Sequence, residues 1–119
     1  MDETKTVTIY RAGGLPLEFD GRVLGFATSD DGVKERWFEV AIYATATGKY
    51  VVHGAGMSEV DGEEDRHWAE VCETPAEVVA ALQRTNENGV KYLPRTSQDA
   101  LRAAVESDGD FAAAYLERV

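Results

Sequence analysis

The spacing of apolar residues changes once along this chain, and that change constrains the fold more than any other feature. Over residues 5–72 apolar and polar side chains alternate at every second position, as in strands that cover a core with one face. From Thr74 onward the apolar residues recur at every third or fourth position, which is typical of helices. The sequence therefore predicts an α+β fold, in which an antiparallel β-meander of five or six strands is followed by two or three short helices packed on one face.

A chain of 119 residues is long enough to enclose one hydrophobic core. It contains no internal repeat, no linker and no low-complexity tract. We therefore expect a single domain over residues 1–119, with the β-meander in residues 1–73 and the helical part in residues 74–119.

The clearest predicted strand spans residues 35–45. Phe38, Val40 and Ile42 alternate with more polar residues there and therefore share one face of the strand. We expect this face to be part of the core.

A turn signal, Asp20-Gly21, lies between two earlier runs of strand-forming residues. Asp-Gly is typical of a two-residue β-hairpin, which would make the runs two separate strands. The alternative is a single strand with a bulge at Gly21.

The helical part begins with a recognisable start signal. Thr74-Pro75-Ala76-Glu77 places a threonine at the N-cap, proline at the first helical position and glutamate at the third, which is a capping box. Residues 86–89, Asn-Glu-Asn-Gly, are expected to end this helix. Thr96 is predicted to cap a second helix, and residues 108–110 to separate it from a third.

The net charge of −10 restricts the kinds of partner. Free nucleic acid and anionic membranes bind basic surfaces, so neither is expected, whereas a basic protein surface would be attracted.

Three features bear on the location of the protein. Cys72 is the single cysteine, the first five residues lack an apolar signal segment, and no apolar run is long enough to cross a membrane. We therefore expect a cytoplasmic protein. The sequence indicates no cofactor and leaves the oligomeric state open.

Most of that charge lies in residues 57–77, the acidic stretch, where eight carboxylates face one arginine and give −7. Such a concentration can bind a basic partner, imitate nucleic-acid phosphates, collect a cation or simply be a solvated loop. The candidate partner-binding residues are the acids around its predicted turn and their neighbours: Glu59, Asp61, Glu63, Glu64, Asp65, Trp68 and Glu70.

Residues with catalytic or metal-binding chemistry are few. His53, His67 and Cys72 are the candidates for nucleophilic catalysis or zinc binding, but no motif with the required spacing surrounds them. His67 and Cys72 are an odd number of residues apart on one predicted strand, so they should face opposite sides of the sheet. We therefore assign no catalytic and no metal-ligating residue.

A short set of motifs resembles the EXLDI family. The set comprises Phe19-x-Gly21-Arg22-x-Leu24, the strand over residues 39–45, and Thr47-Gly48-Lys49-Tyr50 followed by a hydrophobic pair and His53. The resemblance covers roughly residues 5–85 and implies a bacterial module of a sheet and helices, with no settled activity and no catalytic residues. This chain lacks the N-terminal helical segment of that family, which resembles a ribbon-helix-helix DNA-binding arm, and it also lacks the C-terminal E-x-L-D-I.

These observations favour a non-enzymatic, small acidic protein-binding module, with a regulatory, immunity or inhibitor role in a bacterial or phage conflict system. One alternative is a small hydrolase or transferase that uses His53, His67 and Cys72. Another alternative is an inhibitor that mimics nucleic acid, which would need carboxylates spaced along a stripe.

Overall fold

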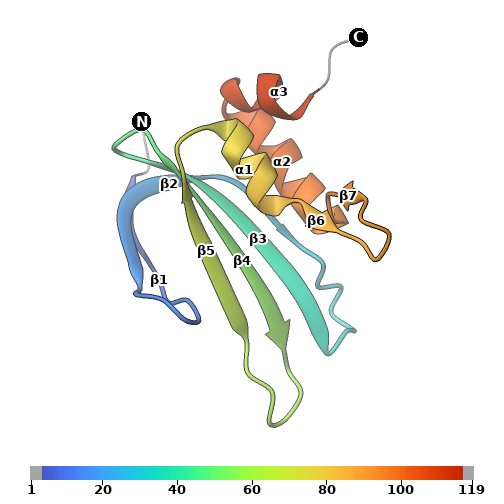
Figure 1. Ribbon diagram of the computed structural model, residues 1–119. Coiled ribbons are helices and arrows are strands. Elements are labelled where there is room, and N and C mark those ends of the chain that lie inside the picture. Colours follow the sequence, from blue (N-terminus) through green and yellow to red (C-terminus); the bar gives the residue numbers. More distant parts are fainter. Residues whose placement is uncertain (1–3, 117–119) are drawn as a thin grey trace.

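The computed structural model describes residues 4–116, and it confirms the predicted α+β architecture (Figure 1). Five strands pair antiparallel in chain order: β1 (Lys5–Ile9), β2 (Leu17–Thr28), β3 (Arg36–Thr45), β4 (Tyr50–Ser58) and β5 (Arg66–Cys72). The remaining elements are α1 (Pro75–Leu82), a hairpin of β6 (Arg84–Thr85) and β7 (Lys91–Tyr92), α2 (Arg95–Ser107) and α3 (Asp110–Tyr115). None of the helices in the described part of the chain is long and apolar enough to cross a membrane.

The helices cover one face of the sheet, here called the helix face, and bury the main core against it (Figure 1). The strands contribute Leu24, Val40, Ile42, Val52 and Cys72 to this core, and the helices contribute Val78, Leu82, Ala100, Leu101, Ala104 and Phe111. Alternation therefore identifies the face of β3 correctly, because Val40 and Ile42 are both buried.

Phe38 lies on the same face of β3, but the prediction that it belongs to the core is wrong. Its relative exposure is 67%. It pairs with Gly56 near the end of the sheet that α2 does not cover. Alternation fixes which way a side chain points, whereas burial also depends on how far the helices extend along the strand.

The sheet curls, so that its first strand returns toward its last over the face opposite the helices (Figure 1). The Ala12 amide donates a hydrogen bond of 3.1 Å to the His67 carbonyl, and the Arg11 side chain donates one of 3.0 Å to the Ala69 carbonyl. The loop after β1 thus covers the outer edge of β5. The opposite face also has a small buried cluster, made by Ile9, Ala41, Val51 and Ala55.

The predicted hairpin at Asp20-Gly21 is wrong, and the single-strand alternative is correct with a different bulge position. β2 runs without a turn through Gly21, which pairs with Lys5 on one side and Thr45 on the other. The irregularity in the pairing falls between Val23 and Gly25 instead. Two neighbouring strands satisfy the backbone of β2, and this tertiary pairing outweighs the local turn preference.

The capping box at the start of α1 is confirmed. The Thr74 hydroxyl accepts a hydrogen bond from the Glu77 amide at 3.2 Å, and the Glu77 carboxylate accepts one from the Glu73 amide at 2.9 Å. The Glu77 amide also donates to the Thr74 carbonyl at 3.1 Å, and the carboxylate of Glu77 reaches back to the amide of the residue before the N-cap, so the two side chains together fix the start of the helix.

The later helix boundaries differ from the prediction. α1 ends at Leu82, before the predicted stop at residues 86–89, and residues 84–92 form the small β6–β7 hairpin. α2 begins at Arg95, directly after Pro94, so Thr96 lies inside its first turn and caps nothing. Proline is compatible with a helix start because its fixed φ suits the position and it needs no hydrogen-bond acceptor.

Candidate functional site

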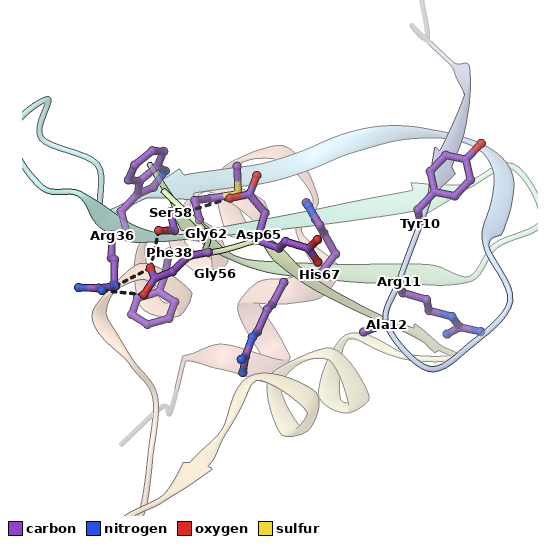
Figure 2. A pocket seen from close by; sticks show the side chains of 15 residues that line it. Tyr10, Arg11, Ala12, Arg36, Phe38, Gly56, Ser58, Gly62, Asp65 and His67 are labelled. Carbon is purple, nitrogen blue, oxygen red and sulfur yellow. Dashed lines mark hydrogen bonds and ion pairs between the residues drawn. The ribbon is translucent and has the colours of Figure 1, made fainter. Parts of the chain in front are cut away.

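A wide cavity of about 790 Å³ lies between the loop after β1 and the hairpin formed by β4 and β5 (Figure 2). Tyr10 and Arg11 line one side, and Arg36 and Trp37 of β3 line the other together with residues of the hairpin. The cavity therefore combines aromatic surface with charges of both signs. It is the candidate site because the predicted acidic residues border it.

The β4–β5 hairpin is held in place by its own carboxylates (Figure 2). Two nitrogens of the Arg36 guanidinium donate to the two carboxylate oxygens of Glu63, at 2.8 and 2.7 Å. The Ser58 hydroxyl donates to Glu63 at 2.6 Å, and the Ser58 amide donates to Asp65 at 2.9 Å. The hydrogen bonds from Arg36 and Ser58 lower the pKa of Glu63 to about 2. Glu63 and Asp65 thus fix the shape of the hairpin.

Three other predicted acids, Glu59, Asp61 and Glu64, are exposed at the tip of the same hairpin. Their carboxylates form no hydrogen bond or ion pair with any residue in the range 4–116. Gly62 makes the turn between them with a φ of 87°, which fits the predicted turn at Asp61-Gly62. The hairpin therefore presents three unpaired negative charges on an anchored support.

Trp68 and Glu70, the remaining predicted residues, do not join the acidic tip. Trp68 packs against the main core, and the Arg84 guanidinium lies 5.2 Å from its ring centre. Glu70 pairs with Val52 and lies on the same helix face. The structure therefore gathers the five acids of residues 59–65 in one loop and places the other two residues along β5.

Two histidines meet on the opposite face of the sheet, which the sequence prediction did not foresee. His53 on β4 and His67 on β5 are both half-buried, and His53 Nε2 lies 2.9 Å from His67 Nδ1. Burial lowers the pKa of His53, the neighbouring His67 lowers it further, and Glu39 acts in the other direction. Glu39 itself accepts a hydrogen bond of 3.0 Å from the Trp37 indole. At least one histidine must stay neutral to accept the bond between the rings.

The histidine pair predicts that the stability of the protein depends on pH and that a single substitution weakens this dependence. The lowered pKa means that unfolded chains take up a proton at His53 as the pH falls through about 6.5, while folded chains resist it. The free energy of unfolding should therefore decrease from pH 7.5 to pH 5.5. In His53→Gln, which keeps a donor for His67, this decrease should be smaller. Urea denaturation at the two pH values measures it, and equal decreases in both proteins would contradict the assignment.

Cys72 lies apart from the two histidines, as its position on β5 predicts. It is buried on the helix face and pairs with Tyr50, whereas His67 points to the opposite face. Burial raises the pKa of its thiol to about 11, with further contributions from Glu70 and Glu77. A protonated, buried thiol is a poor nucleophile. The three residues that the enzymatic alternative requires are therefore not assembled in one place.

Within residues 4–116, no group of three or more histidine, cysteine, aspartate or glutamate side chains has a geometry that could hold a metal ion.

The histidine pair could not be derived from the sequence because its formation depends on the register of β4 and β5. In this register His53 pairs with Ala69, and Ala55 pairs with His67. Only that register places the two rings diagonally on one face.

Comparisons of the chain with protein-family models, with curated proteins and with solved structures find no match.

Proposed function

We propose that this chain is a non-enzymatic module that binds a basic surface of a partner protein through the tip of the β4–β5 hairpin. The observation that carries the proposal is the set of unpaired carboxylates of Glu59, Asp61 and Glu64 on a hairpin anchored by Arg36 and Glu63. A rigid support lowers the entropy lost on binding, and unpaired charges attract the partner over a distance. A regulatory, immunity or inhibitor role in the cytoplasm belongs to the same proposal.

Two features favour this function over the alternatives. Cys72 and the histidine pair lie on opposite faces, so a hydrolase or transferase built on the three has no common site. The carboxylates of residues 59–65 gather in one loop, whereas a nucleic-acid mimic needs them along a stripe. The cavity beside the loop adds Tyr10 and Trp37 as aromatic contacts for the partner.

Neutralising the hairpin tip should slow association with the partner. A variant carrying Glu59→Gln, Asp61→Asn and Glu64→Gln removes three charges and leaves the Arg36–Glu63 contact intact. We expect an association rate lower by on the order of tenfold at low salt and a weaker dependence on salt, because electrostatic steering is screened. Surface plasmon resonance on the partner captured from the source organism, at two salt concentrations, measures both.

The matched control changes the same number of charges elsewhere. Glu18→Gln, Glu87→Gln and Glu106→Gln alter exposed carboxylates outside the hairpin. If the net charge alone mattered, both triple variants would slow association equally, and the proposal would fail. An unchanged rate in the hairpin variant would have the same consequence.

A further inference from the structure

A second cavity, of about 500 Å³, lies on the helix face between the end of the sheet and the start of α2. Aromatic side chains from three separate elements line it: Phe38 of β3, Trp68 of β5 and Tyr92 of β7. Phe38 is the residue expected in the core, and Tyr92 belongs to the β6–β7 hairpin. We call this cavity the aromatic groove.

Two glycines of β4 keep the floor of the aromatic groove open. A Cβ on Gly54 would overlap the indole of Trp68, so the glycine allows that ring to lie directly over the strand. A Cβ on Gly56 would meet only the Phe38 ring, at 3.9 Å. The indole of Trp68 therefore covers Gly54, while the backbone at Gly56 stays bare beside the exposed Phe38 ring, a shape that suits a flat apolar group.

Two arginines, Arg66 and Arg84, border the same groove. Neither forms an ion pair with a carboxylate in the described part of the chain. One Arg84 nitrogen donates to the carbonyls of Ala81 and Gln83, and the guanidinium lies over Trp68, which leaves its other N–H groups available. Glu39 also borders the groove, but its carboxylate bonds to Trp37 on the opposite face. The groove thus offers positive charge within a strongly acidic protein.

The start of α2 adds further donors. This helix of 13 residues has Pro94 at its N-cap and no side-chain cap, so backbone N–H groups in its first turn lack acceptors within the helix. Ser97 lines the groove and has a relative exposure of only 5%. Its hydroxyl makes no hydrogen bond to another residue in the range 4–116, and because no fully enclosed side-chain oxygen in that range lacks a partner, this hydroxyl reaches the open space of the groove. A helix start of this kind attracts anions.

We propose that the aromatic groove binds a small anion that carries an aromatic ring, either an aromatic carboxylate or an aryl phosphate. The ring lies over the bare backbone at Gly56, against Phe38 and the indole of Trp68 that covers Gly54. The anionic group binds Arg84, Arg66 and the hydroxyl of Ser97 at the start of α2. The groove shares Phe38, Gly56 and Arg66 with the cavity beside the β4–β5 hairpin, but the acids of the hairpin tip do not line it, and binding there requires no protein partner.

Nuclear magnetic resonance titration with phenyl phosphate and benzoate tests the proposal. The chain has two tryptophans, whose indole N–H signals report on opposite faces of the sheet. We expect the Trp68 signal to shift on titration and the Trp37 signal to stay in place. Inorganic phosphate and cyclohexanecarboxylate, which lack the aromatic ring, should bind at least about tenfold more weakly. Whichever of phenyl phosphate and benzoate binds more tightly shows whether the site prefers a phosphate or a carboxylate.

Two variants separate the contributions of charge and shape. Arg84→Gln should weaken binding about tenfold, which is the loss of one charged hydrogen bond, while Arg102→Gln on the outer side of α2 should leave it unchanged. Gly56→Val should fill the space above the strand and abolish binding of the aromatic ligand, although Arg66 and Arg84 are unchanged in this variant. No Trp68 shift at millimolar probe, equal shifts of both tryptophans, or equal affinity for inorganic and phenyl phosphate would overturn the proposal.

Discussion

Phe111→Ala lowers the free energy of unfolding by about 3–5 kcal/mol, the range for removing a buried aromatic ring. Phe111 is fully buried although it belongs to the short helix α3, and its ring meets that of Tyr50 edge-on, with centres 5.3 Å apart. The ring connects α3 to the sheet and to the other helices of the core. Its loss leaves a cavity that the surrounding backbone cannot close. Denaturation in urea, followed by circular dichroism, measures the change.

The matched control is Phe38→Ala, which removes the same ring from an exposed position. It should change stability by no more than about 0.5 kcal/mol, as is usual for surface substitutions. Similar losses in the two variants would mean that Phe38 is buried and that the aromatic groove is filled by the protein itself.

Gly25→Ala destabilises the protein by about 1–3 kcal/mol, although it adds only one methyl group. Helix α2 crosses β2 so closely at this point that a Cβ would overlap the carbonyl oxygen of Ala100 and lie 2.9 Å from the amide nitrogen of Ala104. Both atoms belong to the helix backbone, so the whole helix must shift to make room. Thermal unfolding and urea denaturation should both show the loss.

Gly56→Ala is the comparison for Gly25→Ala, because it makes the same change on the neighbouring part of the sheet where space is available. It should be neutral or slightly stabilising, since alanine restricts the unfolded chain more than glycine does. If Gly25→Ala were equally well tolerated, α2 would have to lie farther from β2 than the structure places it.

Local patterns in the sequence predict most of the fold. Alternation finds the strands and their faces, and the capping box at Thr74 marks the start of α1, because both depend on neighbouring residues. The failures at Phe38, Asp20 and Thr96 have a common physical reason. Each depends on what a distant element does: how far α2 covers β3, whether two strands flank β2, and where Pro94 starts a helix.

The same difference between local and long-range features decides how much of the candidate site the sequence predicts. The acidic tip at residues 59–65 is local, so the sequence predicts it as a unit. The anchoring of Glu63 by Arg36 joins the β4–β5 hairpin to β3, and composition carries no signal for it. The histidine pair and the aromatic groove require the register of the sheet and the placement of β7, and both emerge only from the folded chain.

The loop after β1 has a consequence for folding and self-association. An open sheet exposes backbone donors and acceptors on its outer strands, on which a second chain can add. By bonding to the carbonyls of His67 and Ala69, residues 11 and 12 occupy two of the outer acceptors of β5. The Arg11–Ala69 hydrogen bond joins residues 58 positions apart in the sequence, so a chain in which this loop has not yet closed leaves that part of the edge open to a second chain.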